Sequence, residues 1–318
     1  MKKKSFFINS AMLVVMGSLI FSSCKKDDTA AKSNTITDVV VSGSSFTTLE
    51  SAVIKADLQA TLSGTGPFTV FAPDDAAFTA SGITTAVLNS LTATQVKNIL
   101  LYHTIGSKIL AADVPAGPNA KVITAGGDSV FVTKNATGVY INGIKVNTAD
   151  VPADNGVIHI IGKVLVPASG NIVETAVAGG LDSLVKAVTR ATTAPGGDPT
   201  LAATLGSARL TVFAPTNAAF TQLLTALGLT KIDNIPVATL LAVLRYHVVA
   251  GRAFSSDLSN GNLAMLAGGN TTINLSNGTS GGPTITGNGN ASNKSNIIAT
   301  NIVCRNGVVH LIDRVLLP

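Results

Sequence analysis

The sequence has no tryptophan, and aromatic residues make up only 4% of its 318 residues. Sites that stack on sugars or on unpaired bases depend on exposed aromatic faces, so this composition argues against a glycan or single-strand nucleic-acid platform. Charged residues are also scarce, at 12%, whereas hydrophobic residues reach 46%. Such a chain is expected to fold around well-packed cores and not to be disordered.

Long apolar runs are confined to the N-terminus, where the pattern is typical of an export signal. A basic start at Lys2 to Lys4 precedes an apolar stretch from Phe6 to Phe21, which is shorter than the roughly 20 residues that a spanning helix needs. Residues 1–23 are therefore predicted to be a signal peptide. The segment ending at Cys24 resembles a bacterial lipobox, although Phe21 stands where an aliphatic residue is usual. Ordinary secretory cleavage beside an incidental cysteine is the alternative.

Lipidation at Cys24 would make residues 24–35 a polar tether. The charged residues that follow Cys24, KKDD, resemble the surface-export signal of some Gram-negative lipoproteins, so an outer-membrane lipoprotein at the cell surface is expected. A periplasmic orientation stays open. Removal of residues 1–23 lowers the formal charge from +5 to +2, which leaves no case for nucleic-acid binding. Cys304 is then the one remaining cysteine and is interpreted as a small buried hydrophobic residue.

Three blocks occur twice in the same order. FTVFAPDDAAF at 68–78 returns as LTVFAPTNAAF at 210–220, and NGVIHIIGKVLVP at 155–167 returns as NGVVHLIDRVLLP at 306–318. A Tyr-His pair lies between them in each copy. The spacing is far above the roughly 20–50 residues of a solenoid unit, so each copy can hold its own core. We expect two domains, at residues 36–168 and 169–318.

The drift in spacing between copies predicts insertions in the second copy near residues 192–206 and 276–296, both of loop composition. The linker of three residues, 168–170, predicts restricted contact between the domains. In each copy, helical patterns come first and short strands follow, which predicts an α+β fold with an antiparallel sheet. Residues 68–71 are predicted to form a buried strand, Asp74 to cap a short helix that runs to Phe78, and residues 94–102 to form a further helix. Residues 157–166 and 308–317 are predicted to close each copy as strand, bend and strand.

The repeated blocks resemble the fasciclin-type (FAS1) domain, whose marks are a TVFAPTNxAF block, a Tyr-His after a helix and a terminal NGVIHxIDxVLxP block. The resemblance covers nearly everything after residue 35. Asp74-Asp75 replaces Thr-Asn in the first copy, and Gly162 stands where the second copy has Asp313. The resemblance implies two FAS1 domains, each a wedge-shaped β-sandwich surrounded by helices.

All four histidines fall in the repeated blocks, as the pairs His103 with His247 and His159 with His310. A metal site would need a third ligand at suitable spacing, which neither block contains. We therefore predict partly buried histidines that donate to backbone carbonyls at a sheet edge, with no metal and no cofactor. Because both copies retain these histidines, a role in folding is favoured over a role in catalysis or metal binding.

Two further constellations are weak candidates. Ser129 follows Gly126-Gly127-Asp128, but the second copy has Thr271 after Gly-Gly-Asn, and no G-x-S-x-G motif exists, so a turn is predicted and not a hydrolase. Asp150, Asp154 and Asn155 could suggest a calcium loop. The second copy has Asn301, Arg305 and Asn306 there, so turn and cap chemistry is preferred.

The Tyr-His pairs, Tyr102-His103 and Tyr246-His247, are the candidate partner-binding residues, because the resemblance implicates this region in adhesion. A structural role at the end of a helix is the competing interpretation, and it is favoured. The sequence thus predicts a non-catalytic, lipid-anchored adhesion or binding protein with a protein or extracellular-matrix partner. The alternatives are a lipoprotein that captures a glycan, peptide or other small ligand for an uptake system, and a structural envelope scaffold.

Overall fold

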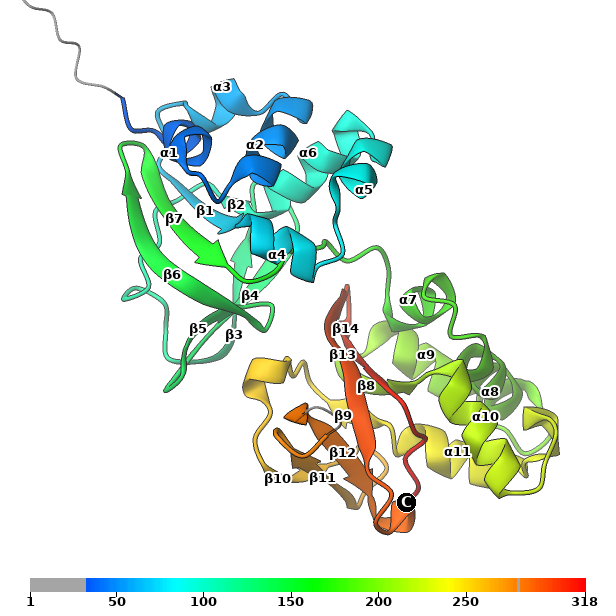
Figure 1. Ribbon diagram of the computed structural model, residues 1–318. Helices are drawn as coiled ribbons and strands as arrows, with labels where there is room; N and C mark the ends of the chain where they lie inside the picture. Colours follow the sequence, from blue (N-terminus) through cyan, green and yellow to red (C-terminus); the bar gives the residue numbers. More distant parts are fainter. Residues whose placement is uncertain (1–32, 279–280) are drawn as a thin grey trace, which may run out of the picture. The chain divides into compact units, whose positions relative to one another are not determined.

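The computed structural model describes residues 33–278 and 281–318. The predicted signal peptide, Cys24 and most of the tether lie outside the described residues. Two domains follow, each with helices and seven strands in one hydrogen-bonded order (Figure 1), which confirms the α+β class. Within the described ranges, none of the helices has the length and apolarity needed to cross a membrane.

The first domain begins with three short helices and then alternates strands with helices before its meander of strands. Its helices are α1 (Ile36–Ser42), α2 (Thr47–Lys55), α3 (Gln59–Leu62), α4 (Asp75–Ala80), α5 (Thr85–Ser90) and α6 (Ala93–Tyr102). Its strands are β1 (Phe68–Pro73), β2 (Thr104–Ile105), β3 (Gly117–Ile123), β4 (Ser129–Asn135), β5 (Gly138–Ile141), β6 (Ile144–Ala153) and β7 (Gly156–Ile161).

The second domain repeats this order. Its helices are α7 (Ile172–Ala178), α8 (Asp182–Thr193), α9 (Pro199–Ser207), α10 (Asn217–Ala226) and α11 (Val237–Arg245), with 3₁₀ turns η1 (Ile232–Asn234), η2 (Ser255–Asp257) and η4 (Asn288–Asn290). Its strands are β8 (Leu210–Pro215), β9 (Val248–Ala250), β10 (Gly261–Ala264), β11 (Asn270–Asn274), β12 (Thr284–Gly287), β13 (Ser295–Cys304) and β14 (Gly307–Ile312).

Both sheets are mixed, so the predicted purely antiparallel sheet is wrong. The strand order is β2-β1-β7-β6-β5-β4-β3 in the first domain, and β1 runs parallel to β7. The second domain pairs β8 with β14 in the same way. The glycine of each Asn-Gly-Val block permits this pairing, because a Cβ on Gly156 would lie 2.1 Å from the Phe68 carbonyl oxygen.

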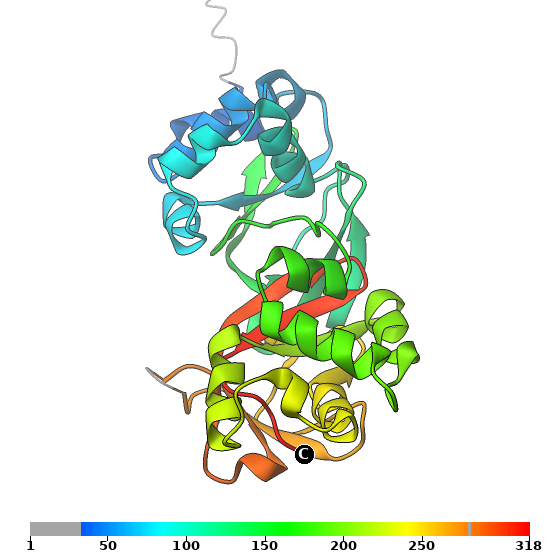
Figure 2. The ribbon, with the colours of Figure 1, turned by 90° about the vertical axis from the view of Figure 1, so that its right-hand side faces the viewer.

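Each domain holds two hydrophobic cores. In the first domain, one core packs the helices against β1 and β7, and a second gathers residues from β1, β2, β4, β5, β6 and β7 within the bent sheet. The second domain has the same pair of cores, and α7, α8, α9 and α11 cover β8 and β14 (Figure 2). Because β1 and β8 carry core on both faces, they are buried apart from Phe68 at the start of β1, which confirms the predicted buried strand.

The predicted second strand after each bend does not form. Beyond β7, residues 163–167 have no regular structure, because side chains bind the amides that a strand ladder would use. The Val164 N–H donates to Ser81 Oγ at 2.9 Å, and the Leu165 N–H donates to His103 Nε2 at 2.9 Å. The segment after β14 is held similarly, since the Leu316 N–H donates to His247 Nε2.

The predicted insertions contain more regular structure than their loop composition indicated. Residues 192–206 include most of helix α9, because Asp198 accepts from the Thr200 N–H as the N-cap and Pro199 takes the first helical position. Residues 276–296 include strand β12 and η4.

Both residues of the Asp74-Asp75 pair cap helices. Asp74 is the predicted N-cap of α4 and accepts from the Ala77 N–H at 2.7 Å. Asp75 acts at a distance, accepting from the Thr48 N–H and the Thr47 hydroxyl, both at 2.8 Å, at the start of α2. In the second domain Asn217 accepts from the Ser183 N–H at the start of α8 in the same way.

Asp75→Ala should therefore destabilise the first domain by about 1 to 2 kcal/mol, the usual cost of losing an N-cap. Asp75→Asn should cost less, because the second domain uses an amide at this position. Urea unfolding followed by signals from the first domain measures both. Equal losses for the two variants would contradict the capping role.

Candidate functional site around the Tyr-His pairs

The Tyr-His pairs end α6 and α11, and the structure buries all four side chains. Tyr102, His103, Tyr246 and His247 are each 2% exposed. The structural role favoured from the sequence is therefore what these side chains perform. A role of the Tyr-His pairs in partner binding stays a prediction. Because the four side chains are buried, they could affect binding only by positioning the residues on the surface around them.

Each tyrosine ties its helix to the strand meander. The Tyr102 hydroxyl donates to the Ser129 carbonyl at 3.1 Å and accepts from the Asn142 side-chain amide at 2.9 Å. Burial raises the pKa of Tyr102 to about 12, so the hydroxyl keeps its proton. The Tyr246 hydroxyl donates to the Asn270 carbonyl and accepts from the Asn288 N–H. The hairpin after each Gly-Gly is thereby fixed against the helix.

Each histidine of a pair joins a helix to the closing segment. His103 Nδ1 donates to the Ile99 carbonyl at 2.8 Å, while Nε2 accepts from the Leu165 N–H. His247 makes the same bonds to Val243 and Leu316. Burial lowers the pKa of both histidines to about 4, although the hydrogen bond to the helix carbonyl opposes the shift. Both rings are therefore neutral at pH 7.

The second histidine pair is also engaged with the backbone. His159 Nε2 donates to the Ile109 carbonyl at 2.9 Å, and His310 Nε2 donates to the Ala253 carbonyl at 3.0 Å. The His159 ring stacks on Phe71 and the His310 ring stacks on Phe213. The prediction that all four histidines donate to backbone carbonyls is confirmed, but they are buried and not partly exposed as predicted. In the ranges that the structure describes, no three His, Cys, Asp or Glu side chains gather as metal ligands.

The acidic loop before β7 performs the predicted turn and cap chemistry. Asp154 accepts from the Asn34 N–H at 2.8 Å, and Asp150 accepts from the Ala111 N–H at 2.9 Å. Asn155 is the centre of the loop: its Oδ1 accepts from the Ile36 N–H, and its Nδ2 donates to the carbonyls of Leu62 and Gly64, all within 2.9 Å.

Asn306 repeats this arrangement in the second domain. Its Oδ1 accepts from the Ile172 N–H, and its Nδ2 donates to the carbonyls of Leu205 and Ala208, each at 2.9 Å. Cys304, two residues earlier, is a free thiol that is 1% exposed, and burial raises its pKa. Its interpretation as a buried hydrophobic residue is confirmed.

The Gly-Gly segments are hairpin turns, as predicted. Thr124 N–H donates to the Asp128 carbonyl at 2.9 Å, which closes the turn that leads to Ser129. In the second domain the corresponding turn carries Leu266, which is 48% exposed. Its N–H donates to the Val248 carbonyl as the Ala125 N–H donates to the Thr104 carbonyl, so Ala125 is its counterpart. A difference between the two copies therefore lies directly beside a Tyr-His pair.

Leu266 borders a hollow of about 540 Å³ next to Tyr246. Its wall also includes Ala267, Gly268, Asp198, Pro318 and residues of α9 and α11. Arg245 and Asp198 make an ion pair across it. Hydrogen bonds from Thr200 and Arg245 lower the pKa of Asp198, so the pair is charged at neutral pH. We call the exposed group Arg245, Leu266 and Gly268 the Leu266 surface.

Thr69 and Thr211 are fully buried in β1 and β8, and their role was not predicted from the sequence. The Thr69 hydroxyl donates to the Ser107 carbonyl at 2.7 Å and accepts from the Ile109 N–H at 2.8 Å. Thr211 does the same with Gly251 and Ala253. The sequence contains a pattern that could have predicted this role, because both copies retain a threonine within an otherwise apolar strand.

These features define a class: a duplicated α+β domain whose repeated marker residues hold the fold together. Residues 44–167 and 184–318 both match the Fasciclin domain family. The chain belongs to the fasciclin family.

Individual relatives match one domain's length of this chain. Protein sll1483 of Synechocystis sp. is 42% identical over 135 residues, which are 42% of this chain and 73% of that protein. The uncharacterized protein sll1735 of the same organism is 38% identical over 142 residues, 41% of this chain and 96% of that protein. Transforming growth factor-beta-induced protein ig-h3 of Sus scrofa is 36% identical over 135 residues, which cover 42% of this chain and 19% of that protein.

A solved FAS1 domain pair from the insect cell adhesion molecule fasciclin I matches 85% of this chain and 96% of its own length. The sequence identity is 19% and the TM-score is 0.40.

Proposed function

We propose that this protein is a non-catalytic adhesion protein of the cell surface, anchored through lipid on Cys24, and that the Leu266 surface of its second domain binds a protein or extracellular-matrix partner. The family supports adhesion, since Fasciclin domains occur in cell-adhesion and extracellular matrix-binding proteins. The anchor rests on the lipobox-like segment, and stable anchoring requires two or more acyl chains.

One observation carries the choice of surface. The repeated marker residues turn inward and serve folding, so a partner has to be recognised by residues that differ between copies. Leu266 is such a residue: its long apolar side chain is half exposed, whereas its counterpart Ala125 carries only a methyl group. An exposed apolar side chain beside a charged pair is typical of a protein-binding surface, where a buried anchor is surrounded by a polar rim.

Leu266→Glu should reduce binding to the partner at least tenfold, because a charge would have to be buried in the contact. The measurement compares adhesion of cells that display the wild-type or variant protein to immobilised extracellular-matrix protein. Val177→Glu is the matched control, since Val177 is 57% exposed on α7 of the same domain. Adhesion that falls equally in both variants would remove the Leu266 surface from the proposal.

The anchor has its own test. Intact cells are treated with protease, and wild type is compared with Cys24→Ala. We expect wild type to be digested on unbroken cells and the variant to be released as soluble protein. Protection of wild type until the outer membrane is opened would rule out cell adhesion and favour a periplasmic scaffold. A variant that stays bound to the membrane would overturn lipid anchoring.

A further inference from the structure

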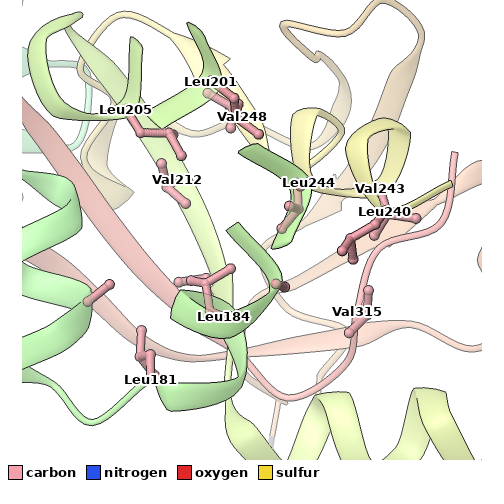
Figure 3. Packing of buried hydrophobic residues seen from close by; sticks show 14 of the residues in the cluster. Leu181, Leu184, Leu201, Leu205, Val212, Leu240, Val243, Leu244, Val248 and Val315 are labelled. Carbon is pink, nitrogen blue, oxygen red and sulfur yellow. The ribbon is translucent and has the colours of Figure 1, made fainter. Parts of the chain in front are cut away.

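The helical layer of the second domain contains an apolar pocket of about 160 Å³ between α7, α8, α9 and α11, with β8 and the start of β9 at its base. Figure 3 shows this layer and labels five residues of the pocket wall: Leu184, Leu205, Val212, Leu244 and Val248. The buried His247 of the second Tyr-His pair also lines it. The pocket belongs to one domain and is separate from the Leu266 surface.

A difference in helix length accounts for the pocket. In the first domain α2 ends at Lys55, and Asp57 turns the chain with a φ of 52° directly into α3. In the second domain α8 continues to Thr193, so that five residues, 194–198, separate it from α9. The additional turn of α8 places Thr192 in the wall, next to Thr189 one turn earlier.

Side-chain size leaves the widened space unfilled. The shared hydrogen bonds of Asn155 and Asn306 make Leu62 and Leu205 equivalent, which aligns Gln59 with Ala202. Ala202 lines the pocket with a single methyl group where the first domain carries the longer glutamine. Protein interiors are normally packed without gaps of this size, so an unfilled apolar space has to be explained.

The chemistry of the wall selects the kind of occupant. No charged side chain lines the pocket, and its polar side chains are already bonded within the domain. The hydroxyls of Thr189 and Thr192 donate to carbonyls of α8, and both nitrogens of His247 are bonded to the backbone. An ionic ligand would lose its hydration without finding a partner, whereas an uncharged apolar ligand would lose only unfavourable contact with water.

We infer that this pocket binds a small, uncharged, apolar molecule of about the size of one six-membered carbon ring. A dry apolar cavity of about 150 Å³ takes up benzene, so the volume is sufficient. Thr189, which is exposed, marks the open side through which the molecule enters. This inference does not depend on adhesion or on the Leu266 surface.

The test uses the chain from residue 24 onward, with benzene and cyclohexane as probes and benzoate as the charged analogue. Methyl NMR signals of Val188 and Leu205 should shift in a saturable way with both neutral probes and not with benzoate. Methyl signals of Val53 in the first domain should not move. A probe at ten times its Kd should lower the unfolding equilibrium constant of the second domain about elevenfold.

Ala202→Leu fills the pocket and should abolish the shifts, and Ala203→Leu is the matched control, because Ala203 is exposed on the same helix. The inference is overturned if neither neutral probe shifts the pocket methyls, if both domains respond alike, or if folded Ala202→Leu binds as wild type does. If Ala202→Leu does not fold, the methyl NMR shifts of the wild-type protein test the inference, because they show where the probe binds without any variant.

Discussion

Asn155→Ala should lower the free energy of unfolding of the first domain by about 3 to 5 kcal/mol. The substitution removes three hydrogen bonds from a side chain that is 7% exposed and leaves the Ile36 N–H and the carbonyls of Leu62 and Gly64 without partners. Each buried polar group left unpaired costs about 1 to 3 kcal/mol, and partial access of water to this edge reduces the sum. Asn306→Ala should have a similar effect on the second domain.

Urea unfolding of the chain from residue 24 onward, followed by NMR signals assigned to each domain, measures both changes. Asn155→Asp should be nearly as damaging as Asn155→Ala, because a carboxylate would face the two carbonyls that the amide now donates to. Asn98→Ala is the control, since Asn98 is exposed on α6. A loss below about 1 kcal/mol for both Asn155→Ala and Asn306→Ala would show that these bonds do not hold the fold.

The roles of residues that act locally could be predicted from the sequence. Asp74 was identified as an N-cap because capping depends on the residues that follow immediately, and the four histidines were assigned to the backbone because both copies keep them. The helix α6 and the strand β1 were placed within one or two residues for the same reason.

What escaped prediction depends on partners distant in the sequence. The pairing of β1 with β7 joins residues about 90 positions apart, so local patterns carried no sign that it is parallel. Residues 163–167 have strand-like composition but give their amides to Ser81 and His103. The Leu266 surface and the pocket of the second domain likewise arise where separate helices and turns meet.

Lowering the pH from 7 to 5 should destabilise the second domain about twice as much as the first. Burial lowers the pKa of His103, His247 and His310 to about 4, whereas an unfolded histidine has a pKa of about 6.5. Between these values the unfolded chain takes up a proton that the folded chain refuses. The stability is therefore complete above about pH 6.5 and is lost as the pH falls toward 4.

The size of the effect follows from the number of such histidines in each domain. Each one costs about 1.4 kcal/mol per pH unit within this window, or about 2 kcal/mol at pH 5. The histidines whose pKa burial lowers to about 4 are His103 in the first domain and both His247 and His310 in the second. The expected losses are about 2 and about 4 kcal/mol, so the second domain should unfold first in mild acid.

Urea titrations at pH 7, 6 and 5, with each domain followed by its own NMR signals, test this difference. His310→Gln should halve the pH slope of the second domain, whatever it does to stability at pH 7, because one of the two proton-uptake sites is gone. His103→Gln should likewise remove most of the slope of the first domain. Equal slopes in the two wild-type domains would mean that burial does not set the histidine pKa values. If His310→Gln leaves the pH slope of the second domain unchanged, groups other than His310 cause the acid sensitivity of that domain.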